Sequence, residues 1–343
     1  MIHRLDPLRD QRWPALVDRH PSASLFHTTA WLEALRQTYG YKPVAFTTSA
    51  PTGALANGLL FCRVQSWLRS PRLVSLPFSD HCEPLCNSEE IEFLMRYLQG
   101  ELDHQNWKYL EIRPLDRGFT KSAGFEAIDT YCIHRMDLRM NLDDLFHTLD
   151  KNSLQPQIDR AEQSELVEKC GRSEELLKDF YHLSVLTCRR RHLPPQPFAW
   201  FRNLIRYLGD ALEIRVAYQR ETPVAAFFTL RFRDTTYYKY GSSDARFHNL
   251  GAMPILLWHA ITEAKLKGAT LFDLGRTSLT DEGLMAVKNK WVADPRRLVY
   301  WKFPTAPGDA ARLEWQTHFA NRVFSYIPNR LLMLAGRLIY LHN

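Results

Sequence analysis

The sequence predicts an α/β fold made of two similar units in tandem, each a mixed sheet flanked by helices. The chain has 343 residues, which is enough for two domains at roughly 100–200 residues each. Apolar residues make up 45% of it and charged residues 24%, as in a globular protein with a sizeable core. The third observation is an order of expected elements that occurs twice.

The first occurrence runs strand, strand, Ser-Asp loop, helix, strand. Its helix is recognised from apolar residues that recur every three or four positions, Ile91, Leu94, Leu98 and Leu102. The expected elements are strands over 54–64 and 72–78, a loop with Ser79 and Asp80, a helix over 88–103 and a strand over 107–112.

The second occurrence has the same order and begins with a predicted hairpin. Chance similarity between two αβ stretches is the alternative to a repeat. The expected elements are strands over 213–219, 223–232 and 235–240, a loop with Ser243 and Asp244, a helix over 254–267 that ends at Gly268, and a strand over 269–274.

A polar segment over 151–160, which contains Pro156, predicts a hinge within residues 135–165. We therefore expect a first domain over 1–140 and a second over 141–310. Residues 311–343 form a basic tail, in which 329–341 fits one amphipathic helix. Such a helix can rest on an anionic membrane, and we expect peripheral contact through 320–343; docking onto the protein's own body is the alternative.

The net charge of +6 favours an anionic partner, although a mildly basic surface without a role is equally compatible with it. The six cysteines do not have the spacing of a disulfide framework. The run His81 to Cys86 lacks a second ligand pair at zinc spacing, so we expect no metal site. The charged N-terminus and the lack of a long apolar run predict a cytoplasmic protein.

A loop over 246–252 joins a predicted strand to a predicted helix, where free backbone N–H groups can bind phosphate. It resembles the pyrophosphate loop of GNAT N-acetyltransferases, with Asn249 in place of the first glycine. Asparagine tolerates a left-handed backbone, so the turn is expected to form. A plain strand-to-helix turn is the alternative. The candidate phosphate-binding residues are Arg246, Asn249, Gly251 and Ala252.

Two further groups are candidates for substrate binding. Arg190 and Arg191 lie in a basic cluster at a helix end, where guanidinium groups suit phosphate; a solvated turn is the alternative. Tyr238 and Tyr240 are expected on one face of their strand, with Tyr237 on the other. Such tyrosines can also simply fill a half-buried face.

Lys288 and Trp291 stand three residues apart after the last predicted strand. A lysine beside an aromatic ring can neutralise a phosphate or an oxyanion, and a surface lysine is the alternative. A base is needed to take the proton of an attacking amine. The candidate bases are Asp80, Glu83, Asp244 and Asp273, and no residue pattern indicates covalent catalysis.

The order of several motifs resembles the FemAB-like family of bacterial transferases over about residues 20–305. None is specific alone. The motifs are His27–Glu33 with Tyr39–Tyr41, Leu76–Asp80, Tyr238–Ser243, Asn249–Ala252 and Gly283–Trp291.

This resemblance implies two tandem GNAT-like domains with the acceptor site in a cleft between them. It implies that Lys288 neutralises substrate phosphate beside Trp291, with help from Tyr240 and from Arg190 or Arg191. Chemistry is expected on the side of the second domain, with Asp80 and Glu83 of the first across from it.

The expected activity is formation of an amide on an amine of a peptidoglycan or exopolysaccharide precursor. The donor is acyl-CoA or aminoacyl-tRNA, and the acceptor is an anionic nucleotide-sugar or a lipid-linked molecule. Bridge-building members often carry a long helical arm for tRNA, and residues 176–213 leave no room for one. The alternatives are an acyl-CoA-dependent acetyltransferase on an envelope sugar and a scaffold without catalysis.

Overall fold

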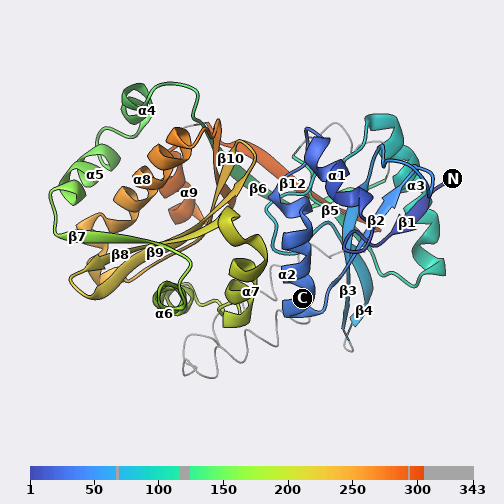
Figure 1. Ribbon diagram of the computed structural model, residues 1–343, viewed down its shortest axis with the longest axis horizontal. Helices are drawn as coiled ribbons and strands as arrows, with labels where there is room; N and C mark the ends of the chain where they lie inside the picture. The colour runs from blue at the N-terminus through green and yellow to red at the C-terminus, as the bar shows by residue number, and fades with distance from the viewer. Residues whose placement is uncertain (67–68, 116–123, 293, 305–343) are drawn as a thin grey trace. The chain divides into compact units, whose positions relative to one another are not determined.

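The computed structural model describes residues 1–66, 69–115, 124–292 and 294–304 (Figure 1). Its described part forms two compact units, residues 1–130 with 298–304, and residues 131–297. The predicted tail over 311–343, with the expected membrane contact through 320–343, lies outside the described residues. No helix in the described ranges has the length and apolar character to cross a membrane.

In the first unit, six strands form a sheet in the order β1-β2-β3-β4-β5-β12. Neighbours are antiparallel except β4 and β5, which are parallel and are joined through helix α3. The elements are β1 (His3–Leu5), α1 (Arg12–Arg19), η1 (Leu25–His27), α2 (Thr29–Tyr39), β2 (Lys42–Thr47), β3 (Leu59–Ser66), β4 (Arg69–Val74), α3 (Ser88–His104), β5 (Leu110–Ile112) and β12 (Arg296–Phe303).

Helix α3 shows why these residues form these elements. Asn87 caps its N-terminus, because its side chain accepts from the Glu90 N–H and the Glu90 carboxylate accepts from the Asn87 N–H. The predicted apolar face is buried against strands β2 to β5, which places the core of the first unit between α3 and its sheet.

The second unit repeats this topology with the strand order β7-β8-β9-β10-β11-β6. Again one neighbouring pair is parallel, β10 with β11, and helix α8 joins it. The elements are β6 (Glu126–Asp137), α4 (Leu142–Thr148), α5 (Leu154–Glu162), β7 (Leu166–Gly171), α6 (Glu174–Arg190), α7 (Phe198–Leu208), η2 (Gly209–Ala211), β8 (Leu212–Gln219), β9 (Thr222–Phe232), β10 (Thr235–Ser243), η3 (Ala245–Leu250), α8 (Ala252–Leu266), β11 (Leu271–Ser278) and α9 (Glu282–Asn289).

The predicted repeat is therefore confirmed. The structure adds that the two units exchange their last strands, β6 and β12. Strand β6 follows the first five strands in sequence, yet it pairs with β11 of the second unit. Strand β12, which ends the described chain, pairs with β5 of the first unit. Each sheet is thus completed by a strand from the other half of the sequence.

The predicted hinge within 135–165 is wrong, because these residues lie inside the second unit. Residues 154–162 form helix α5, and Leu154 and Ile158 are buried in the core with α8. Pro156 stands in the first turn of α5, where a helix does not need the missing N–H.

Helices cover both faces of the second sheet (Figure 1). Helices α5 and α8 pack on one face around Phe227. Helices α6 and α7 pack on the other, where Phe180 and Phe201 contact Phe228. The separation of these two faces decides which side chains can reach the candidate site.

Candidate functional site

The parallel strands β10 and β11 pair over only three residues and then separate. Their register ends at Tyr237 opposite Asp273. Beyond that point β10 has a bulge between Lys239 and Ser242, and β11 has an irregularity before Arg276. Bulges bend a strand and end its pairing, so the two strand ends leave room beside them.

A cavity of about 310 Å³ lies at this place, on the face covered by α5, α8 and α9. This volume is within the range typical of small-molecule sites. The lining residues are Leu154, Gln157, Val224, Ala225, Tyr238, Ser243, Phe247, His248, Ala252, Met253, Pro254, Leu257, Leu274, Leu284, Val287, Lys288, Lys290 and Trp291.

Lys288 brings a fixed positive charge into the wall of this cavity. It is buried, and its Nζ donates to the carbonyl oxygens of Gly275 at 3.0 Å and Arg276 at 3.2 Å. These carbonyls belong to the irregular part of β11, where Gly275 has a φ of +73°. The bend of β11 therefore creates the acceptors that hold the ammonium group in place.

A buried histidine lies close to Lys288. The Nε2 of His134 is 2.8 Å from Oδ1 of Asn289, the residue that follows Lys288. Burial lowers the pKa of His134, and the charge of Lys288 lowers it further, although the bond to Asn289 opposes both effects. His134 is therefore neutral at physiological pH and adds no second cation next to Lys288.

The mouth of the cavity carries a serine and a histidine in contact. Ser243 Oγ is 2.9 Å from His248 Nε2, and Arg190 donates to the Ser243 carbonyl at 3.0 Å. Burial lowers the pKa of His248, and the charge of Arg190 acts in the same direction. A neutral imidazole at this place can accept a proton from a bound amine.

Four predicted site residues line the cavity together: Lys288, Trp291, Tyr238 and Ala252. The ring of Tyr238 packs on Phe227, and burial raises its pKa to about 12. Tyr238 therefore acts as a neutral wall residue at physiological pH.

The two predicted arginines do not line the cavity, but both connect elements at its mouth. Arg190 binds Ser243, as described above. Arg191 forms an ion pair with Asp281, whose side chain also accepts from the Leu284 N–H and caps helix α9. The C-terminus of α6 is thus joined to β10 and to α9.

Tyr240 is on the opposite face of the sheet from Tyr238, so the prediction that the two share one face is wrong. Tyr240 has a φ of +62° within the bulge of β10, which reverses the alternation of side chains. Its hydroxyl accepts from Trp200 Nε1 at 2.9 Å, and its ring contacts Phe201 edge-to-face. Tyr240 therefore packs with α7, away from the cavity.

The four acidic candidates also lie away from the cavity lining. Asp273 is buried, pairs with Arg135 at 3.0 Å and accepts from the Gly275 N–H, so its carboxylate is engaged within the protein. Asp244 caps η3 and pairs with Arg246. Asp80 and Glu83 belong to the first unit, where the Glu83 carboxylate accepts from a backbone N–H and Tyr300 donates to the Asp80 carbonyl at 2.6 Å.

The predicted phosphate loop has a different conformation from the one expected. Asn249 lies within the η3 turn without a positive φ, and Gly251 is the residue in the left-handed region, at φ +68°. A Cβ on Gly251 would lie 2.8 Å from the Gln157 carbonyl oxygen, so α5 packs tightly over the start of α8. Arg246 is largely exposed beside Asp244 and does not line the cavity.

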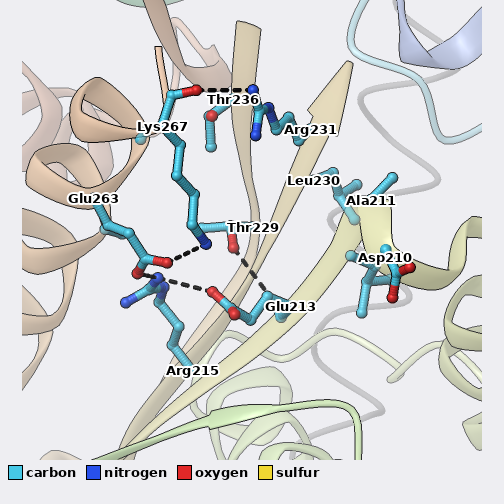
Figure 2. A pocket seen from close by; sticks show the side chains of 13 residues that line it. Asp210, Ala211, Glu213, Arg215, Thr229, Leu230, Arg231, Thr236, Glu263 and Lys267 are labelled. Carbon is cyan, nitrogen blue, oxygen red and sulfur yellow. Dashed lines mark hydrogen bonds and ion pairs between the residues drawn. The ribbon is translucent and has the colours of Figure 1, made fainter. Parts of the chain in front are cut away.

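A second cavity, of about 140 Å³, lies in the same unit among β8, β9, β10 and α8 (Figure 2). Four of its charged side chains pair with one another. Arg215 binds Glu213 at 2.8 Å and also Glu263, which in turn binds Lys267. Because these charges are satisfied internally, the larger cavity is the better candidate for a substrate site.

Sequence reasoning did not assign roles to Ser243, His248 and Lys290, although all three stand in motifs that it singled out. Their positions in the sequence could have indicated a role, because Ser243 and His248 follow the end of a predicted strand and Lys290 stands close to Lys288. Nothing local indicated Gln157 of α5, which reaches the site only through tertiary packing.

Comparison with known proteins identifies the fold. Residues 151–283 match a family model described as an acetyltransferase (GNAT) domain. A search of curated protein sequences found no match. Among solved structures, the chain is similar to FemX, with a TM-score of 0.68 and 14% identity over 92% of this chain and 99% of that one.

Two further structures share the fold over most of the chain. One is a tandem GNAT protein from the clavulanic acid biosynthesis pathway, with a TM-score of 0.55 and 10% identity over 90% of this chain and 99% of that one. The other is the C-terminal domain of a putative lysylphosphatidylglycerol synthetase from Agrobacterium fabrum, with a TM-score of 0.59 and 13% identity over 91% and 95%. The predicted tandem GNAT fold is thus confirmed, and the chain shares this fold with FemX.

Proposed function

We propose that this protein transfers an acyl or aminoacyl group to an amine of a cell-envelope precursor. The observation that carries the proposal is the cavity beside the separated ends of β10 and β11, in which a fixed Lys288 and a neutral His248 share an apolar wall. The GNAT domain over 151–283 and the similarity to FemX support transfer of this kind.

The reaction needs few groups from the protein. The nitrogen of the acceptor attacks the carbonyl carbon of the donor, a C–N bond forms, and the C–S or C–O bond to the carrier breaks. His248 accepts the proton that the amine loses, and the carrier leaves as a thiol or a hydroxyl after protonation. Lys288 stabilises the negative charge that develops on the carbonyl oxygen or on a phosphate of the substrate.

The donor and the acceptor follow from the same proposal. Acyl-CoA or aminoacyl-tRNA supplies the transferred group, and an anionic nucleotide-sugar or lipid-linked molecule supplies the amine. A peripheral position at the inner face of the membrane suits a lipid-linked acceptor. Mass spectrometry of small molecules that copurify with the full chain identifies which donor class it retains.

The test is an amide-formation assay on the full chain, with acyl-CoA or aminoacyl-tRNA as the donor and a UDP-linked precursor that carries a free amine as the acceptor, read by mass spectrometry. We expect Lys288→Met to lower kcat/KM by roughly a hundredfold, the size typical of losing one fixed charge that stabilises a transition state. His248→Gln should lower it by about the same factor and remove the acidic limb of the pH profile, which lies below pH 6.5 because the pKa is lowered from that value.

The control is Lys178→Met, on the exposed side of α6. It removes the same charge from the surface and should leave kcat/KM unchanged. Full activity of folded Lys288→Met, or its complete complementation of a deletion strain, would contradict the proposal and favour a scaffold without catalysis.

A further inference from the structure

The cavity of the second unit is apolar over most of its wall. Aliphatic and aromatic side chains come from every element that lines it, and Trp291, Leu257 and Leu274 are almost fully buried there. Such a wall excludes water and favours a hydrocarbon group.

The charges of the wall have one sign. Lys288 and Lys290 line the cavity, and none of its described lining residues is Asp or Glu. An aminoacyl group carries an α-ammonium cation. Bringing that cation into an apolar wall beside Lys288, without a carboxylate to pair with it, is strongly unfavourable. An anionic ligand is instead attracted by the positive charges of Lys288 and Lys290.

The size of the cavity sets the length of the group. At about 30 Å³ for each water-sized group, a volume of 310 Å³ has room for on the order of ten such groups. Val287 also lines the cavity and is 52% exposed, so the opening carries an apolar side chain as well as the polar Ser243 and His248. A chain of intermediate length can therefore lie inside with its polar end at the mouth.

We infer that this cavity binds an apolar acyl chain of up to about ten carbons whose carrier end is anionic, and that it discriminates against aminoacyl donors. The inference rests on the proposed transferase function and selects the fatty acyl class among its donors. The same C–N bond forms, and the bond between the acyl carbon and its carrier breaks.

Isothermal titration calorimetry of the full chain with sodium decanoate tests this inference. We expect binding at one site, on the order of a hundredfold tighter than sodium hexanoate, since each additional buried CH₂ adds a few-fold in affinity. Decyltrimethylammonium bromide has a chain of the same length with a cationic head. It should bind at least tenfold more weakly than decanoate.

Two matched pairs of variants locate the site. Leu284→Trp narrows the cavity and should weaken decanoate at least tenfold, whereas Leu266→Trp, on the exposed side of α8, should not change it. Lys290→Glu reverses a lining charge and should weaken decanoate several-fold, whereas Lys178→Glu should leave it unchanged. Circular dichroism confirms that each variant is folded.

Equal or tighter binding of decyltrimethylammonium would overturn the inference, as would failure of decanoate to bind. Failure of the chain-binding inference can be distinguished from failure of the proposed transferase function. Tight decanoate binding without any transfer in the amide-formation assay would contradict the transferase and leave the chain-binding site standing. Transfer of aminoacyl groups by a protein that does not bind decanoate would do the reverse.

Discussion

Two buried imidazoles, His27 and His134, are both held neutral. For His27, burial of the neutral ring makes the stability of the folded protein depend on pH. His27 is fully buried in the first unit, where its Nε2 lies 2.8 Å from the Glu83 carbonyl and its Nδ1 accepts from the Ser24 N–H at 3.1 Å. Burial lowers the pKa of His27 to about 4, against the weaker opposing effect of these backbone bonds. The folded state thus binds a proton much less readily than the unfolded chain.

The expected consequence is a loss of stability in acid. Between pH 6.5 and pH 4 the unfolded chain is protonated at His27 and the folded protein is not, so stability falls as the pH is lowered through this window. Moving from about pH 7 to about pH 5 should cost about 2 kcal/mol through this residue. His27→Gln removes the titrating group. Between pH 7 and pH 5, the unfolding free energy of this variant, measured by urea titration, should fall by about 2 kcal/mol less than that of the unchanged protein. Parallel pH curves for the two proteins would contradict this assignment.

At the scale of elements, the site depends on how α5 meets the start of α8. The backbone of Gly251 is left-handed, and the Gln157 carbonyl occupies the space that a Cβ would need. The same contact carries Leu154 and Gln157 into the wall of the cavity. Close packing of two helices at one glycine therefore shapes the site.

Gly251→Ala should push α5 away from the start of α8. We expect a loss of about 1–3 kcal/mol in unfolding free energy, since the strained φ and the steric overlap both act against alanine. Gly283→Ala is the control, because glycine there has an open environment near the start of α9. If Gly251→Ala unfolds at the same urea concentration as the unchanged protein, α5 does not pack at this point.

At the scale of the whole molecule, the exchange of the sixth strands makes each sheet depend on a distant part of the sequence. Trp301, Lys302 and Phe303 of β12 pair with β5, whose residues Leu110 and Ile112 are buried. Without β12, β5 would become an open edge with unpaired backbone N–H and C=O groups.

Hydrogen–deuterium exchange can test this dependence. A chain that ends at Pro295 lacks β12, whereas a chain that ends at Pro304 keeps it. We expect the amides of β5 to lose protection in the shorter chain relative to the longer one, and those of β8 and β9 to keep it. Equal protection of β5 in both chains would show that β12 does not complete the first sheet.

The sequence alone determined the elements and their repeated order. Apolar periodicity predicted α3, and the position of Gly268 helped to predict α8, each to within two residues at its ends. The motif after the last predicted strand placed Lys288 and Trp291 beside one pocket, which both of them line. These features are local, because helix periodicity and caps are set by residues a few positions apart. The tandem GNAT fold could be inferred from their order along the chain.

Only the tertiary structure decided the rest of the site. The bulge in β10 moved Tyr240 to the other face, α5 replaced a predicted hinge, and Asp273 is occupied by Arg135 of β6. Each outcome depends on a partner that is distant in sequence, and local preferences carry no information on which distant strand or helix packs there. The cavity and its single sign of charge arise from several separate segments, so they exist only once those segments have come together.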